Sequence, residues 1–250
     1  MRFAFGTLTV LPVRLRRWDR AAARGGMLCA PVAGLVIGLA AAALGTLLLL
    51  GSGPLLAAVA TAAVPAVLTR GLHLDGLADT ADGLGSGKPA EDALRIMKQS
   101  DIGPFGVITL LFTLLAQVAA LSQLYEQSWT RGAAAAVLAA VTARCALTLA
   151  ARTGVPAARP EGLGAAVAGT VPLRWAVTAG ATVTVLAAAT GALHGAYEAL
   201  HAGAAALIAL ATGEATLRRC RHRFGGITGD VFGAIAETTG VAAVVVLAVG

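Results

Sequence analysis

Long uncharged apolar runs constrain the fold of this chain more than any other feature. Residues 25–69 contain no Asp, Glu, Lys or Arg, which is enough chain for two helices of the roughly 20 residues that cross a bilayer. Charged residues make up only 13% of the 250 residues and apolar residues make up 57%, whereas about a quarter of a soluble domain is charged. We therefore predict an all-α, polytopic integral membrane bundle.

The uncharged runs predict seven transmembrane helices within one domain that covers residues 1–250. Gly and Pro in the segment 51–54 mark the turn of the first hairpin. A basic segment precedes the first span, as in a secretory signal, but more spans follow, so we interpret the first span as retained. The predicted spans are 27–50, 54–70, 104–124, 132–152, 173–193, 197–213 and 231–250, of which the sixth is short and the weakest.

The distribution of Lys and Arg predicts the orientation of the bundle. Seventeen of the 19 basic residues, Arg16 among them, lie in the N-terminal segment or in loops on the same side of the predicted spans. Basic residues accumulate on the cytoplasmic side of membrane proteins. We therefore predict a multi-pass membrane protein with its N-terminus, long loops and active site cytoplasmic.

Other partners and sites are not indicated by the composition. The net charge of +6 follows from the positive-inside bias, and no interleaving of aromatic and basic residues suggests nucleic-acid binding. Cys29, Cys145 and Cys220 are isolated and form no CxxC pair. We interpret them as small buried apolar residues, neither disulfides nor metal ligands. The sequence leaves the oligomeric state open.

An acidic segment carries the strongest chemical signal. In a helix over residues 73–85, Asp75, Asp79 and Asp82 are spaced i, i+4 and i+7 and share one face. Neighbouring carboxylates repel, and hard oxygen ligands suit Mg²⁺. From periodicity alone, a solvated helix on the membrane surface explains the pattern equally well. However, the cytoplasmic lipid surface is itself negative, which favours a site that holds a cation.

Two basic segments are candidates to hold phosphate. Arg95 and Lys98 lie one turn apart before the third span, although topology alone would also place them there. After the basic run 218–223, a glycine loop leads into the last span, and such loops hold anions at a helix N-terminus. The alternative is a positive-inside anchor. The loop residues with a predicted role are Gly225, Gly226, Thr228, Gly229 and Asp230.

Two ionisable residues lie within predicted spans. Arg144 and Glu237 are each seven or eight residues, about 10 Å, from a helix end. Charged groups at that depth are costly, so a partner or a function is expected, and the two residues are candidates to pair with each other. His73 adjoins the acidic segment, where it is a candidate phosphate ligand or helix cap. Acidic, basic and glycine-loop features together indicate phosphoryl transfer.

The segment 71–84, with the sequence GLHLDGLADTADGL, resembles the signature of the cobalamin synthase family, also called adenosylcobinamide-GDP ribazoletransferases. Further similarity to this family lies in residues 5–12, 96–106 and 225–230, with Gly233 and Glu237. Arg144 also falls where the family carries an arginine. The resemblance therefore extends along most of the chain.

The resemblance implies a Mg²⁺-dependent phosphotransferase of the bacterial inner membrane. Its substrates would be adenosylcobinamide-GDP and α-ribazole or its 5'-phosphate, and its products adenosylcobalamin or its 5'-phosphate and GMP. Asp75, Asp79 and Asp82 would be catalytic and would bind Mg²⁺ with Asp230. The residues expected to bind substrate are His73, Arg95, Lys98, Arg144, Gly225, Gly226, Thr228, Gly229 and Glu237.

One motif departs from the family pattern. The family usually reads Lys-Asp-Ser-Arg-Ile-Gly, but this chain has Gln99 and Asp101 in place of the Asp and the Arg. We assign no role to Gln99, and we expect Asp101 to compensate for the lost acid.

Two alternative functions compete with this one. A CDP-alcohol phosphotransferase needs an Ala-Arg pair where this chain has Ala78 and Asp79, and an ion transporter would show an inverted repeat that is not evident.

Overall fold

The structure is a computed structural model that describes residues 1–14 and 17–249, so the predictions for Arg16 and Gly250 lie outside it. The described residues form twelve α-helices and no β-strand. The long helices are α3 (Ala30–Gly51), α4 (Pro54–Leu68), α7 (Pro104–Gln127), α8 (Trp129–Ala150), α10 (Leu173–Ala192), α11 (Ala196–Phe224) and α12 (Gly229–Ala248). The shorter helices are α1 (Arg2–Leu8), α2 (Arg20–Leu28), α5 (Leu72–Gly85), α6 (Ala90–Ile96) and α9 (Gly162–Val167).

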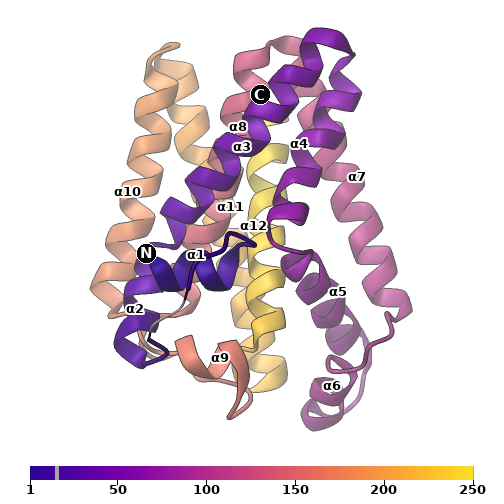
Figure 1. Cartoon of the computed structure of the whole chain (residues 1–250), viewed down its shortest axis with the longest axis vertical. Helices are drawn as coiled ribbons and strands as arrows, with labels where there is room; N and C mark the ends of the chain where they lie inside the picture. The colour runs from indigo at the N-terminus through magenta and orange to yellow at the C-terminus, as the bar shows by residue number, and fades with distance from the viewer. Residues whose placement is uncertain (15–16, 250) are drawn as a thin grey trace.

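The prediction of about seven membrane spans is confirmed. In the described part of the chain, six helices are long and apolar enough to cross a bilayer: α3, α7, α8, α10, α11 and α12. The pair α4 and α5 meets the same test, but the two helices meet at an angle of 88° and form a broken span or a re-entrant segment. Figure 1 shows the long helices standing side by side, with α5 leaving the end of α4 toward the lower part of the bundle.

The sixth span was predicted too short. It was expected over residues 197–213, but α11 has 29 residues and continues to Phe224. The charged residues that follow the apolar run, such as Glu214 and Arg218, do not break a helix, and they pair with each other at 2.8 Å with i, i+4 spacing. The helix ends at Gly225, whose φ of 77° is the left-handed conformation that favours glycine.

Small residues let the helices approach closely, as is usual in membrane bundles. A Cβ at Gly34 of α3 would lie 2.4 Å from the carbonyl oxygen of Ala140 in α8. A Cβ at Gly76 of α5 would lie 2.6 Å from the carbonyl oxygen of Asp230, and one at Gly233 of α12 would lie 2.8 Å from that of His73. The backbones of α5 and α12 are therefore in direct contact.

Short elements cover the end of the bundle at which α11 ends and α12 begins. In Figure 1, α1 crosses in front of the long helices, while α2 and α9 lie below it and the C-terminus lies at the opposite end. Phe3 and Leu8 of α1 are buried, and α1 packs against α2 and α3. The N-terminal segment thus belongs to the packed structure and borders the site described below.

The contact of α5 with α12 can be tested by adding a single methyl group. Gly233→Ala should lower the free energy of unfolding by about 1–3 kcal/mol, because the added Cβ overlaps the backbone of α5. Gly51→Ala is the matched control, since a Cβ there meets nothing within 4 Å, and it should change stability by at most about 0.5 kcal/mol. Thermal unfolding in detergent, followed by circular dichroism, measures both variants, and equal stability of the two would contradict the tight contact.

Candidate active site

A cavity of about 1230 Å³ adjoins the exposed side of α5. Its walls come from the N-terminal segment 6–14, the turn 69–72 between α4 and α5, two turns of α5, the segment 97–102 and one residue of α7. We call it the acidic cavity. The charged residues that line it are Arg14, Arg70, Asp75, Asp79, Lys98 and Asp101.

The bend before α5 turns two of the predicted aspartates toward this cavity. Arg70, at φ 54°, is the only non-glycine residue with positive φ in the described chain, and Gly71 follows at φ 70°. Such left-handed conformations are costly for a residue with a side chain and cluster at functional sites. Beyond the bend, α5 packs against α7 and α12, which leaves Asp75 exposed and Asp79 half-buried in the cavity wall.

The packing of α5 decides between the two interpretations of its sequence. Half of its 14 residues are buried, among them His73, Leu77 and Thr80. A solvated helix on the membrane surface would bury only one apolar stripe. The helical spacing of the acidic segment is therefore confirmed, and the surface-helix alternative is wrong.

Asp82 has a different environment from Asp75 and Asp79. It is 7% exposed, and its two carboxylate oxygens accept backbone N–H groups of Gly103 at 2.7 Å and Gly106 at 2.9 Å. These amides begin α7, where a helix has unpaired donors and a positive dipole end that a carboxylate satisfies. Asp82 does not line the acidic cavity, and its predicted roles in catalysis and metal binding stay predictions.

Asp230 lies behind α5, at the start of α12. Its carboxylate accepts a hydrogen bond from the Thr228 hydroxyl at 3.1 Å and lies 3.4 Å from the guanidinium of Arg159. The same guanidinium donates to the carbonyl of Leu94. Arg159 therefore brings a positive charge to the side of α5 that packs against α12, and the sequence alone indicates it only as one of the basic loop residues.

Magnesium fits the cavity only in part. In the described residues, no three His, Cys, Asp or Glu side chains are grouped so that they could hold a metal ion. Asp75 and Asp79, however, offer hard oxygen ligands on one wall of the cavity. Mg²⁺ is commonly held by one or two carboxylates together with substrate phosphates and water. The donor set therefore fits an ion that the substrate helps to bind.

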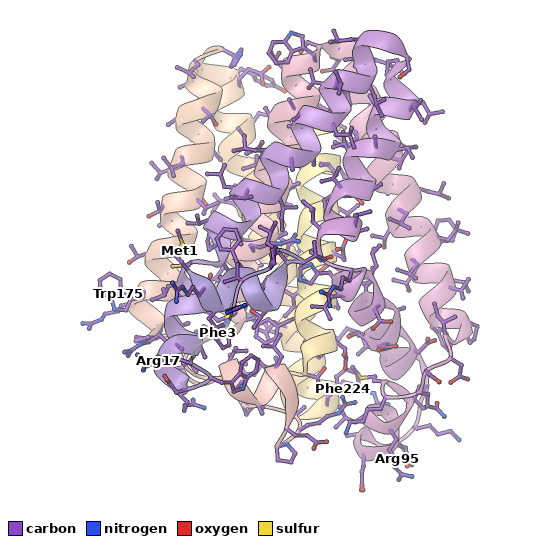
Figure 2. The ribbon with its side chains drawn as sticks, viewed as in Figure 1. Met1, Phe3, Arg17, Arg95, Trp175 and Phe224 are labelled. Atoms are coloured by element: carbon purple, nitrogen blue, oxygen red, sulfur yellow. The ribbon has the colours of Figure 1, made fainter. Side chains whose placement is uncertain are left out.

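Of the two predicted phosphate-binding residues near α6, only Lys98 lines the cavity. Its ammonium lies 2.7 Å from the carboxylate of Glu161, and this hydrogen bond and charge hold the pKa of Glu161 below its usual range. Arg95 pairs with Asp92 on the exposed surface of α6. Figure 2 shows Arg95 at the lower end of the molecule, away from the bundle.

Arg144 and His73 lie inside the bundle and do not line the acidic cavity. Each is at most 3% exposed, and a guanidinium N–H of Arg144 in α8 donates to Nδ1 of His73 at 3.1 Å. The direct ion pair of Arg144 with Glu237 does not form, although both residues border an internal void of about 30 Å³. This volume is enough for a buried water. These positions indicate that Arg144 and His73 hold α5 in place.

The glycine loop packs against the segment that precedes α9. The N–H of Ile227 donates to the carbonyl of Pro156 at 3.0 Å, and the N–H of Ala158 donates to that of Ile227 at 2.9 Å. The Thr228 hydroxyl caps α12 by accepting the N–H of Val231 at 3.2 Å. The helix start is confirmed. Gly225, Gly226, Thr228 and Gly229 do not line the acidic cavity, and their predicted contact with substrate stays a prediction.

Two further basic residues of the cavity were missed by the sequence analysis. Arg14 follows the N-terminal motif and Arg70 immediately precedes the acidic one. The sequence signal for Arg70 was its place beside the motif. No local sequence pattern marks Arg14, because it reaches α5 only through the packing of the N-terminal segment. In this packing the N–H of Val10 donates to the carbonyl of Leu68 at 2.7 Å.

Comparison with known proteins identifies close relatives over the whole chain. The family model described as cobalamin-5-phosphate synthase matches residues 1–248. A protein of Frankia casuarinae named adenosylcobinamide-GDP ribazoletransferase is 43% identical over 99% of this chain and 93% of its own length. Proteins of the same name from a Nocardioides species and from Bradyrhizobium diazoefficiens are each 40% identical, over 94% and 95% of this chain and 92% and 88% of their own lengths. No solved structure matches.

The different environments of the aspartates predict different mutant phenotypes. Asp82→Asn should destabilise the protein by about 1.5–3 kcal/mol, because a charged acceptor for two helix amides is lost. Asp92→Asn, on the exposed surface of α6, is the control and should change stability by at most about 0.5 kcal/mol. Thermal unfolding in detergent measures the stability of both variants. If Asp82→Asn keeps its stability but loses Mg²⁺ binding, Asp82 is a metal ligand and its proposed structural role is wrong.

Proposed function

The chain belongs to the cobalamin-5-phosphate synthase family, and we propose that the acidic cavity is its active site. Its activity is that of adenosylcobinamide-GDP ribazoletransferases, enzymes of cobalamin synthesis. The alternative functions, CDP-alcohol phosphotransferase and ion transporter, are not favoured, because the family match covers residues 1–248. The observation that carries the proposal is that Asp75, Asp79 and Lys98 line one cavity beside a strained bend.

The proposed reaction is a single phosphoryl transfer. A hydroxyl oxygen of α-ribazole, or of its 5'-phosphate, forms a bond to the cobinamide-linked phosphorus of adenosylcobinamide-GDP. The bond from that phosphorus to the bridging oxygen breaks, and GMP leaves with this oxygen. The hydroxyl proton passes to a carboxylate of the cavity, either Asp75 or Asp79, which acts as the general base.

The residues of the acidic cavity have complementary parts in this reaction. Asp75 and Asp79 would hold Mg²⁺, which when bound neutralises negative charge on the pyrophosphate. Lys98, Arg14 and Arg70 line the other walls and would bind the remaining phosphate oxygens. Since positioning and charge neutralisation dominate phosphoryl transfer, a cavity with both signs of charge suits the reaction.

We also propose that the acidic cavity faces the cytoplasm. Lys98, Arg159 and the basic end of α11 lie at the same end of the bundle as the cavity, and basic residues mark the cytoplasmic side. Substrates made in the cytoplasm would then reach the cavity without crossing the bilayer.

The proposal predicts that turnover needs the carboxylates of the acidic cavity, and Asp79 tests it. With adenosylcobinamide-GDP, α-ribazole and Mg²⁺, the purified protein should release GMP, and Asp79→Asn should lower the rate about 100-fold or more without changing stability, because a cavity carboxylate is lost. Asp92→Asn should release GMP at the unaltered rate. Chromatographic measurement of GMP decides: no release by the unmodified protein refutes the activity, and normal release by Asp79→Asn removes Asp79 from the site.

The cavity also predicts that substrate and metal bind together. Three carboxylates line it, but no three His, Cys, Asp or Glu side chains of the described chain are grouped so that they could hold a metal ion. Mg²⁺ should therefore bind weakly to the protein alone and at least about tenfold more tightly in the presence of GDP. Isothermal titration with and without GDP measures the difference. Equal affinity for Mg²⁺ in both titrations would contradict a site that is completed by substrate phosphates.

A further inference from the structure

A second cavity, of about 380 Å³, lies between α1, α2 and the segment that begins α9. We call it the aromatic cavity, because Phe3 and Trp18 form part of its wall. Its charged lining residues are Asp19, Arg20 and Glu161. Figure 2 shows Phe3 and Arg17 on the side of the molecule away from Arg95, where α1 and α2 meet. The mechanism above makes no use of this cavity.

A single ion pair joins the two cavities. Lys98 lines the acidic cavity and Glu161 lines the aromatic cavity, and their side chains meet at 2.7 Å. The two cavities therefore meet at this pair, and a ligand whose phosphates bind Lys98 can place a neighbouring group beside Glu161. Adenosylcobinamide-GDP has such a shape, since a guanosine is attached directly to its pyrophosphate.

The aromatic cavity offers a ring for stacking. Trp18 is 58% exposed, and it contacts Phe3 with ring centroids 5.2 Å apart and planes tilted by 41°. Phe3 is buried and therefore fixes the position of the Trp18 ring from one side. Stacking on an exposed aromatic ring is the common way in which proteins bind a nucleobase.

The same cavity offers one carboxylate that can accept at least two further hydrogen bonds. Both oxygens of Asp19 are occupied, by the N–H of Ala22 at 2.9 Å and by the Arg17 guanidinium at 2.7 and 3.1 Å. Glu161 accepts only from Lys98, through Oε1, among the described residues. A carboxylate can accept about four hydrogen bonds, so Glu161 can accept two parallel N–H groups while it remains paired with Lys98.

These features fit guanine better than the benzimidazole of α-ribazole. Guanine presents two adjacent donors, N1–H and the 2-amino group, which match the two oxygens of a carboxylate. The benzimidazole of α-ribazole has no N–H, and the lone pair of its free ring nitrogen would be repelled by Glu161. We infer that the aromatic cavity is the guanine subsite, with the base stacked on Trp18 and its N1–H and 2-amino groups bound by Glu161.

The inference rests on the proposed function and adds the binding position of the leaving nucleotide. Lys98 then has two partners: Glu161 on the guanine side and the phosphate oxygens on the reaction side. GMP, the leaving group, would still occupy the guanine subsite after the phosphorus–oxygen bond has broken. Binding of GMP alone therefore reports on the subsite without any turnover.

The test compares the binding of GMP, IMP and AMP to the full-length protein in detergent by isothermal titration. IMP lacks only the 2-amino group, and the unmodified protein should bind GMP about tenfold more tightly than IMP and more tightly still than AMP. Glu161→Gln should bring the GMP and IMP affinities to within about twofold. Glu91→Gln, an exposed residue of α6 outside both cavities, is the control and should preserve the preference for GMP.

Stacking is tested separately at Trp18. Trp18→Ala should weaken GMP and IMP alike, by about tenfold, and Trp18→Phe should restore most of the affinity because a ring is retained. Trp175→Ala is the control, since Trp175 is a half-exposed tryptophan at the start of α10 that lines neither cavity. Unchanged unfolding midpoints of the variants establish that the fold is intact.

The outcomes separate this inference from the proposed function. If the unmodified protein releases GMP from adenosylcobinamide-GDP but Glu161→Gln keeps its preference for GMP over IMP, the guanine subsite is wrong and the function stands. If Trp18→Ala raises the KM for α-ribazole while GMP binding is unaltered, the aromatic cavity binds the benzimidazole and the inference is overturned. Absence of GMP release by the unmodified protein refutes the function itself.

Discussion

The direct contact of α5 with α12 is the constraint on which the site depends. Gly76 and Gly233 have no side chains to separate the two backbones, so an acidic helix can lie against an apolar span with Asp75 and Asp79 turned outward. A side chain at either glycine would overlap the backbone of the facing helix. It would push α5 away from α12 and would move the carboxylates with it. The close approach through small residues therefore positions the carboxylates of α5 and also stabilises the bundle.

Buried polar contacts hold the two ends of α5 in place, in addition to its glycine contact with α12. The hydrogen bond from Arg144 to His73 ties its beginning to α8, and the bonds from Gly103 and Gly106 to Asp82 tie its end to α7. A guanidinium inside an apolar bundle is costly unless it is bonded. Because the bond to His73 offsets part of that cost only when α5 is in place, the buried charge favours one position of the helix.

The sequence was sufficient to predict the elements that depend on local composition. Apolar runs predicted the spans, and the spacing of Asp75, Asp79 and Asp82 predicted a helix, because both signals lie within one segment. The end of α11 differs from the prediction because charged residues end the apolar run without ending the helix, which stops at Gly225. Asp82 was grouped with its neighbours because periodicity cannot reveal that α7 begins beside it. Arg14 and Arg159 reach the site through loops packed from far along the chain, which one sequence does not specify.

The segment after α6 contains the residues that depart from the family pattern, and the structure shows where they lie. Gln99 and Asp101 both line the acidic cavity, so the loss of one acid and the gain of another occur on the same wall, next to Lys98. The net charge of that wall is lower than in the family pattern, since Asp101 stands where an arginine is usual. Arg14 and Arg70 line the cavity from other segments of the chain and supply positive charge there. With the proposed function, the N-terminal segment and the bend before α5 would have a larger share in neutralising a bound pyrophosphate in this chain.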